Sequence, residues 1–261
     1  RLHQSGRGKL TFRLLLSDID GTLLACDGRV HERDRLAISE LIAAGVQVSL
    51  CTGRLYSGTK PLALELGITG PVCCADGSQI VDLSSDEPMV VHALQDEELS
   101  LVLTRCREAG LRSFVLADDE VHHDAEGIAH LPFVRIWSPN CRLVADLCDP
   151  THWLEREAVA VVGLGSAEAV LPLVDWLRRH AQGLQLADFP APTLGGELGA
   201  HAFIVRRAGV SKATGSAWLA QHHGLQLQEV AAVGDWLNDV PMFEVVGRAF
   251  AMGQAPEAVR Q

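Results

Sequence analysis

The sequence lacks the long apolar runs of membrane proteins and the basic excess of proteins that bind nucleic acids. No apolar stretch approaches the length of a membrane-spanning helix. The 261 residues include 22 Lys and Arg against 33 Asp and Glu, which gives a formal net charge of −11. Phosphate backbones and anionic lipid surfaces repel such a chain. We therefore expect neither nucleic acid nor a membrane as a partner, and the oligomeric state stays open.

Cysteine pairs with the spacing of metal sites are also missing. The seven cysteines are scattered and odd in number, and none of them form a C-x-x-C motif. Zinc sites and disulfide frameworks depend on regular spacings, which this distribution lacks. Free thiols in apolar, strand-like runs pack as small hydrophobic groups. We expect reduced, structural thiols and a cytoplasmic location.

The overall composition is that of a folded globular protein, with 48% hydrophobic and 21% charged residues. The length suits one large domain or two smaller ones, and neither an internal repeat nor a low-complexity tract is evident. Residues 1–10 are basic, with Gly and Ser mixed in. We expect this segment to be a flexible leader outside the fold.

Strand and helix patterns alternate at both ends of the chain. The first half predicts a strand from residue 14, a helix over 33–44, a strand over 46–51, a helix over 57–66 and a strand over 71–74. The second half predicts a helix over 211–223, a strand over 230–233, a helix with Pro241 in its first turn and a strand at 250–251. Repeated strand–helix units predict a parallel sheet with helices on both faces.

The middle of the chain follows another pattern. Helices are predicted over 96–109 and 166–180, and strands over 113–117, 158–164, 184–187 and 202–205. Residues 118–150 are interrupted by Pro, Gly and His, and their pattern is the weakest. This part is a second α/β module and not a linker.

The spacing of the candidate site residues supports an insertion. Only 31 residues separate Asp20 from Thr52, which is room for one crossover helix. The 157 residues between Arg54 and Lys212 leave room for a whole module. We predict an α/β protein with a Rossmann-like parallel sheet core, residues 11–83 and 208–261, and an inserted α/β module, residues 84–207.

Two carboxylates follow the apolar run that begins at Leu14. Successive side chains on an extended backbone alternate, so Asp18 and Asp20 lean toward the same place. The two acids repel each other unless a cation lies between them. A hard divalent cation with oxygen ligands fits this requirement best.

Three further groups follow a strand or begin a helix, at the sheet edge where open α/β folds bind ligands. They are Thr52 with Gly53, Lys212 after Ser211, and the stretch from Gly234 to Asp239. Together with the two carboxylates they suit phosphoryl transfer, which requires a nucleophile, a metal and groups that hold phosphate oxygens.

Each group has a place in that chemistry. A carboxylate can act as nucleophile through an aspartyl-phosphate, and its neighbour can protonate the leaving oxygen and later activate water. Asp235 supplies a further metal oxygen. The Thr52 hydroxyl, the Lys212 ammonium and the Asn238 amide can hold the phosphate, helped by the N-terminus of the helix at Lys212.

In these motifs the sequence resembles the haloacid dehalogenase-like hydrolases, specifically the Cof-type phosphatases with a large cap. The matching residues are Asp18-Ile19-Asp20-Gly21-Thr22, Cys51-Thr52-Gly53-Arg54, Ser211-Lys212, Gly234-Asp235-x-x-Asn238-Asp239 and Ala251-Met252-Gly253. The resemblance implies that Asp18 is the nucleophile and Asp20 the acid/base, with Thr52 and Lys212 on the phosphoryl group. It also implies Mg²⁺ held by Asp18, the backbone carbonyl of Asp20, and Asp235, with Asp239 nearby.

The implied activity is hydrolysis of phosphomonoesters of small metabolites, such as sugar phosphates, pyridoxal phosphate or flavin mononucleotide. A phosphomutase on the same fold is one alternative. A non-catalytic binding or regulatory module is another, and the complete set of acids and lysine disfavours it. A response-regulator receiver would be about half this length and has no place for the inserted module.

Five residues leave their role open. Arg54 reaches the substrate, bridges to the cap or lies on the surface. Asp76 stands where relatives usually carry Asn before Gly, which changes the local charge. Trp236 is bulky beside Asp235 and either narrows the pocket or packs under the cap. His122 and its neighbour His123 match no standard metal spacing, and we expect them in an exposed cap loop.

Overall fold

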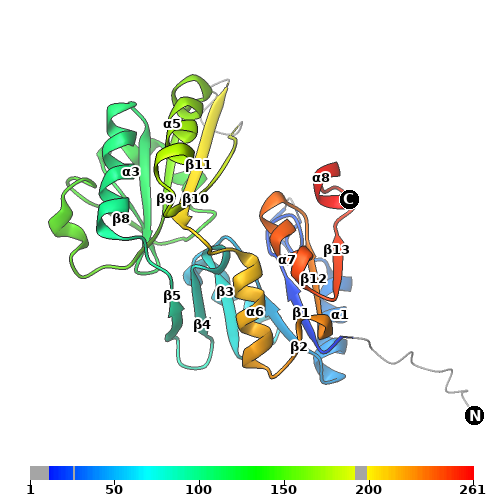
Figure 1. The fold of residues 1–261 in the computed structure, drawn as a ribbon. Helices are drawn as coiled ribbons and strands as arrows, with labels where there is room; N and C mark the ends of the chain where they lie inside the picture. Colours follow the sequence, from blue (N-terminus) through cyan, green and yellow to red (C-terminus); the bar gives the residue numbers. More distant parts are fainter. Residues whose placement is uncertain (1–11, 26, 192–198) are drawn as a thin grey trace, which may run out of the picture.

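The computed structural model describes residues 12–25, 27–191 and 199–261 (Figure 1). The predicted leader, residues 1–10, lies outside the described residues. The chain forms a core from its two ends, and the inserted module forms a cap above it in Figure 1. Within the described ranges, no helix has the length and apolar character needed to cross a membrane.

The main core sheet has four strands in the order β13-β12-β1-β2. These strands are Arg248–Ala251, Val230–Gly234, Leu14–Ser17 and Gln47–Leu50. All three pairings are parallel, as the alternation of strands and helices predicted. The apolar runs of β1 and β12 are buried because helices cover both faces of the sheet.

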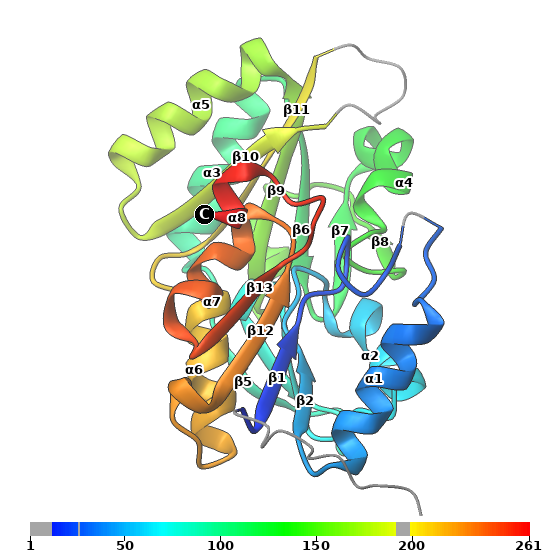
Figure 2. The same ribbon diagram turned by 90° about the vertical axis from the view of Figure 1, so that its right-hand side faces the viewer.

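The two faces of this sheet have separate apolar clusters. Helices α1 (Glu32–Ala43) and α2 (Tyr56–Glu65) cover one face, and α6 (Lys212–His222) and α7 (Val240–Val245) cover the other (Figure 2). Leu50 packs on the side of α1 and α2, whereas Leu16 packs on the side of α6 and α7. A short helix, α8 (Glu257–Arg260), ends the chain.

A three-stranded antiparallel sheet extends the core. It joins β3 (Pro71–Cys74), β4 (Gln79–Asp82) and β5 (Pro88–Val91), and a single bridge between Cys51 and Cys73 connects β3 to the end of β2. The predicted boundary between residues 83 and 84 falls in the turn between β4 and β5. Because β5 pairs with β4, the chain leaves the core only after Val91.

The cap is a six-stranded sheet in the order β10-β11-β9-β6-β7-β8. Its strands are Leu184–Pro190, Ala200–Arg207, Ala158–Ser166, Arg112–Ala117, Glu120–His123 and Cys141–Leu143. All neighbours are antiparallel except β7 and β8. Helices α3 (Asp96–Glu108) and α5 (Ala167–His180) pack on one face, and α4 (Leu131–Val134) contributes to the apolar cluster of the other.

This second face meets the core. Its apolar cluster includes Trp137 from the cap together with Leu55 and Ala75 from the core. The backbone N–H of Leu55 donates a hydrogen bond to the Trp137 carbonyl at 2.7 Å. The N–H of Ser57 donates to a carboxylate oxygen of Asp119, also at 2.7 Å. The cap therefore rests on the loops that follow β2 and β3.

The structure corrects the prediction for one part of the cap. His122 and His123 do not lie in an exposed loop: both are buried on β7, which pairs with β6. The prediction was wrong because a run of polar residues reads as a loop, whereas tertiary packing buries this strand. Among the described residues, no histidine belongs to a cluster that could hold a metal ion.

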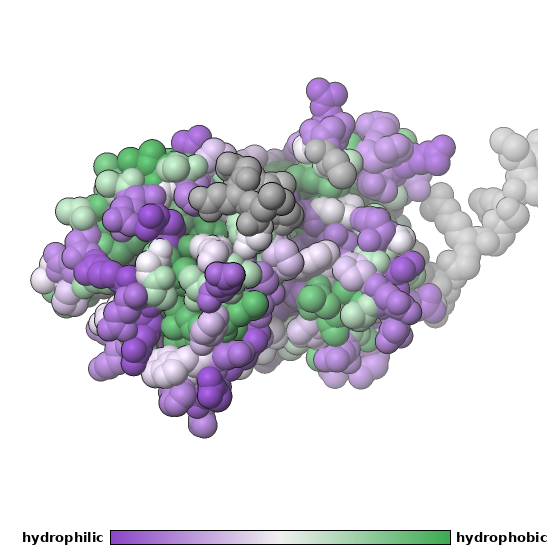
Figure 3. All heavy atoms as spheres, turned by 90° about the horizontal axis from the view of Figure 1, so that it is seen from above, coloured by the Kyte–Doolittle hydropathy of each residue, from purple (hydrophilic) through white to green (hydrophobic). Residues whose placement is uncertain are grey.

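The surface mixes polar and apolar side chains. On the face seen from above in Figure 3, apolar areas occur over both the cap and the core, with hydrophilic side chains around them. Large apolar side chains such as Leu143, Leu154 and Phe250 are exposed at separate places in the fold. Scattered exposed apolar residues are ordinary on globular proteins.

Buried His122 predicts acid sensitivity. Burial, followed by the charges of His152 and Arg156, lowers its pKa to about 4, from 6.5 in an unfolded chain. Below pH 6.5, His122 therefore binds a proton in the unfolded state but stays neutral in the folded state. The free energy of unfolding consequently falls as the pH drops from 6.5 toward 4. We expect wild type to lose roughly 1 to 2 kcal/mol more than His122→Gln between pH 8 and pH 5. Urea unfolding at both pH values measures this difference, and parallel losses would contradict it.

Candidate active site

The candidate residues converge at one edge of the core sheet. Asp18 follows β1, Asp235 follows β12 and Thr52 lies just beyond β2, all at the carboxyl ends of neighbouring parallel strands. Lys212 begins α6, and Asp239 precedes α7. Parallel strands place these ends side by side, so the sequence order of the motifs becomes one site.

A buried ammonium lies at the centre of the site. Lys212 is fully buried, and its Nζ donates to Oδ1 of Asp18 at 2.6 Å and to Oδ1 of Asp239 at 2.5 Å. Burial by itself would lower the pKa of Lys212. The carboxylates of Asp18, Asp239 and Asp76 outweigh burial and hold this pKa well above its ordinary value.

The two carboxylates at the strand ends resist ionisation. Burial raises the pKa of Asp18 to about 7, against the opposing effect of Lys212 and with a further increase from Asp239. Burial also raises the pKa of Asp235, again reinforced by Asp239, although the Thr22 hydroxyl donates to this carboxylate at 3.3 Å. A nearby cation would relieve both carboxylates.

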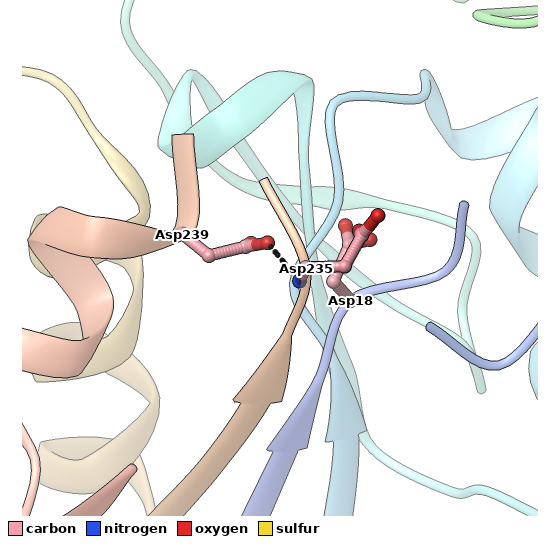
Figure 4. Close-up of side chains that lie close together, drawn as sticks. All are labelled: Asp18, Asp235 and Asp239. Atoms are coloured by element: carbon pink, nitrogen blue, oxygen red, sulfur yellow. Dashed lines mark hydrogen bonds between the residues drawn. The ribbon is translucent and has the colours of Figure 1, made fainter. Parts of the chain in front are cut away.

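Asp18, Asp235 and Asp239 form the acidic cluster of the site. Each offers a carboxylate oxygen, and these oxygens lie within 4.8 Å of one another. Figure 4 shows Asp18 and Asp235 directed to the same place from β1 and β12, with Asp239 reaching toward the backbone of Asp235. Carboxylate oxygens are the donors that Mg²⁺ prefers, so this donor set fits the predicted metal.

Asp239 already uses both of its oxygens. Oδ1 accepts from Lys212, and Oδ2 accepts from the backbone N–H groups of Asp235 and Trp236 at 2.8 and 2.9 Å. These bonds orient the loop that carries Asp235. Asp18 and Asp235 are therefore the better candidates for direct metal ligands, with Asp239 behind them.

The side chain of Asp20 lies apart from the acidic cluster. It is 54% exposed and forms a two-point ion pair with Arg54, at 2.7 Å from Nε and 2.5 Å from Nη2. Arg54 also donates to the carbonyl of Gly58 at 3.2 Å. Arg54 thus holds Asp20, the predicted acid/base, at the cavity, a role that differs from the three that the sequence left open.

The groups predicted to hold phosphate lie around a different acid. The Thr52 hydroxyl accepts from the N–H of Arg54 at 3.2 Å, and the Asn238 amide donates to Oδ1 of Asp76 at 2.9 Å. A Cβ built on Gly53 would lie 3.4 Å from both carboxylate oxygens of Asp76. Asp76 therefore lies among Gly53, Asn238 and Lys212.

A cavity of about 510 Å³ opens over these residues. From the core it is lined by Asp18, Asp20, Thr52, Gly53, Arg54, Asp76, Val210, Ser211, Lys212, Trp236, Leu237, Asn238 and Pro241. From the cap it is lined by Ile136, Trp137, Gln185, Ala187, Asp188, Phe189, Ile204 and Arg206. Trp236 is 47% exposed, so it borders the cavity and is not packed away under the cap.

The sequence did not reveal the contribution of the cap. Arg206, on β11, forms an ion pair with Asp76 across the two parts of the molecule. In the sequence, Asp76 stands out only as an unusual residue before Gly77. Nothing in a strand of apolar residues marks Arg206 as its partner, because the pairing exists only after the cap folds onto the core.

A parallel α/β core, an inserted cap and a buried acid–lysine cluster at the strand ends define a class of phosphoryl-transfer-type hydrolases. The family model described as haloacid dehalogenase-like hydrolase matches residues 15–136 and 197–261. The chain belongs to this family, which confirms the resemblance seen in the motifs.

Individual relatives match over most of their length. The chain is 26% identical over 257 residues to an HMP-PP phosphatase of Serratia proteamaculans, covering 94% of this chain and 85% of that protein. It is 24% identical over 269 residues to the pyridoxal phosphate phosphatase YbhA of Escherichia coli, covering 96% and 91%. A haloacid dehalogenase-like hydrolase structure from Bacteroides thetaiotaomicron superimposes with a TM-score of 0.81 at 23% identity, covering 95% and 91%. The last comparison confirms the predicted fold.

Gly21 predicts a local test of the site. Its φ is +80°, and an added Cβ would lie 2.2 Å from a carboxylate oxygen of Asp235. Gly28 has a similar φ of +72° with nothing within 4 Å of its Cβ position. We expect Gly21→Ala to lower kcat/KM for an aryl phosphate by about 100-fold, because small displacements of a catalytic group are costly. Gly28→Ala, which carries similar backbone strain, should retain activity within about twofold. Equal losses in the two variants would show that strain alone is responsible.

Proposed function

We propose that this enzyme is a Mg²⁺-dependent phosphatase that hydrolyses phosphomonoesters of small metabolites through an aspartyl-phosphate. One observation carries the proposal. The buried carboxylate of Asp18 faces the cavity, is paired with the fully buried Lys212, and lies within 4.8 Å of the carboxylate of Asp235. The phosphatase names of the similar proteins support the same activity.

The reaction proceeds in two displacements at phosphorus. An oxygen of Asp18 attacks, a new O–P bond forms, and the bond to the leaving alcohol breaks as Asp20 gives that oxygen a proton. Water then attacks the aspartyl-phosphate while Asp20 takes its proton. Inorganic phosphate leaves, and Asp18 is regenerated.

The remaining side chains bind the phosphoryl oxygens or orient the carboxylates of Asp18 and Asp20. Lys212 fixes one oxygen of Asp18, and together with Thr52 and Asn238 it binds the phosphoryl oxygens. Arg54 keeps the Asp20 carboxylate in place through its two-point contact. Asp18 and Asp235 would hold the Mg²⁺, which when bound offsets the negative charge of the nucleophile and the phosphoryl group. The cap covers the site and limits access of water.

The cavity walls favour a leaving group with a flat, weakly polar ring over a polyhydroxylated sugar. Several apolar side chains line them, namely Ile136, Trp137, Phe189 and Ile204 from the cap and Val210, Trp236, Leu237 and Pro241 from the core. Sugar hydroxyl groups buried against such walls would lose hydrogen bonds to water. One of the similar proteins is named for pyridoxal phosphate, which supports this class.

Asp18→Asn tests the proposed chemistry. An amide is a far poorer nucleophile than a carboxylate, so kcat for p-nitrophenyl phosphate should fall at least about 1,000-fold. Circular dichroism should show an intact fold, and Asp34→Asn, which changes an exposed acid on α1, should retain full activity. Chelation of Mg²⁺ should abolish turnover of the wild type. Normal turnover by Asp18→Asn would refute the assignment, and an isomerised sugar phosphate in place of free phosphate would identify a mutase.

Trp236→Ala tests the proposed substrate class. Loss of ring stacking should raise KM for pyridoxal phosphate about tenfold, in line with aromatic contacts of about 1 to 1.5 kcal/mol, and should leave KM for glycerol phosphate within about twofold. Phe250→Ala is the matched control, because Phe250 is 49% exposed and Trp236 47% exposed, but Phe250 does not line the cavity. A uniform change across both substrates would contradict a role for Trp236 in ring recognition.

A further inference from the structure

Asp76 is held rigidly beside the site. It lies in the turn after β3 with φ at +51°, a left-handed conformation that a non-glycine residue adopts rarely. Its backbone N–H donates to the Thr52 carbonyl at 2.8 Å. The next residue, Gly77, packs so closely on α6 that an added Cβ would lie 2.3 Å from the carbonyl of Ser211. Asp76 is 5% exposed and has little freedom to move.

The Asp76 carboxylate lies among the groups that would bind phosphate. Oδ1 accepts from Asn238 at 2.9 Å and lies 3.9 Å from Nζ of Lys212. Both carboxylate oxygens approach the Cβ position of Gly53 at 3.4 Å. A fixed anion in such a place repels an incoming phosphoryl group, because charges in a partly desolvated site are weakly screened.

One residue of the cap opposes that charge. Arg206, on β11, is 8% exposed and contacts Oδ2 of Asp76 through Nη2. Strand alternation directs Arg206 and Ile204 to the side of the sheet that lines the cavity, while Val205 packs under the cap helices. Nε of Arg206 is buried and finds no hydrogen-bond partner among the described residues. Removing one partner of a buried ion pair leaves the other charge uncompensated, so Arg206 offsets the charge of Asp76.

We propose that Arg206 is a positioning residue that neutralises Asp76, so that Gly53, Lys212 and Asn238 can receive a phosphoryl group when the cap is closed. The proposal rests on the proposed function, because it concerns the phosphate subsite of the same reaction. Arg206 acts through Asp76 and not by touching the substrate. Phosphate affinity therefore depends on a contact between core and cap.

A double-mutant cycle tests this pairing. Inorganic phosphate is titrated into the full-length protein in the presence of Mg²⁺ by calorimetry, and KM and kcat are measured with p-nitrophenyl phosphate. Arg206→Met leaves a buried, unpaired carboxylate and should weaken phosphate binding about 100-fold, with a larger effect on KM than on kcat. Asp76→Asn should bind phosphate more tightly than wild type. The double variant Asp76→Asn/Arg206→Met should recover to within about tenfold of wild type.

The controls separate charge pairing from general effects. Arg207→Met removes an exposed arginine at the next position of β11 and should bind phosphate as wild type does. Arg206→Lys keeps the positive charge and should retain most of the affinity. If the single variant Arg206→Met does not fold, phosphate affinity is compared between Asp76→Asn and the double variant Asp76→Asn/Arg206→Met. The expected difference is no more than about tenfold.

Three results would overturn the inference. Wild-type affinity in Arg206→Met would show that Asp76 needs no neutralisation. A double variant as weak as Arg206→Met would show that Arg206 touches the substrate itself. A loss of phosphate affinity near 100-fold when Arg206→Met is added to Asp76→Asn would also show that Arg206 touches the substrate. Phosphate binding requires no turnover, so a protein that shows the coupling but hydrolyses no ester would refute the proposed function and leave this inference standing.

Discussion

The site and the core depend on one buried cation. The Lys212 ammonium is fully buried, and burying such an ion without partners would cost several kcal/mol. Asp18 and Asp239 contact it directly, and Asp76 lies at 3.9 Å. These carboxylates follow β1, precede α7 and follow β3, so four distant chain segments must assemble before the charge is compensated. The interaction that orients Asp18 therefore also joins the segments of the core.

The division of labour between core and cap follows from their chemistry. The core contributes most of the charged groups around the cavity, whereas the cap contributes Arg206 and Asp188 together with the apolar side chains of Trp137, Phe189 and Ile204. Phe189 and Ile204 occupy strand positions that alternate with positions packed under α3 and α5, so one face of the cap sheet builds its own core and the other borders the site. Substitutions on the face that borders the site can therefore alter the cavity wall and leave the cap helices in place.

The core was predictable because its signals are local. The apolar run of β1 ends in two acids, and glycine ends the helix patterns before β2 and β3, so the strand–helix alternation and its parallel sheet were predictable from the sequence. The cap was less predictable because its determinants are nonlocal. His122 reads as polar loop sequence and is buried by a neighbouring strand, and β5 joins the core by pairing with β4. The ion pair of Asp76 and Arg206 joins residues 130 positions apart, a separation that no local motif reports.

The charge balance of the cavity favours a divalent cation. Each cation among the described residues that line it already faces an acid: Arg54 faces Asp20, Arg206 faces Asp76 and Lys212 faces Asp18. The carboxylates of Asp235 and Asp239 add negative charge behind them, in a chain whose net charge is −11. A phosphoryl dianion entering this cavity would meet repulsion at short range, where salt screens poorly. An ion with two positive charges, held by Asp18 and Asp235, would reverse that sign at the site, and would so reconcile an acidic protein with anionic ester substrates.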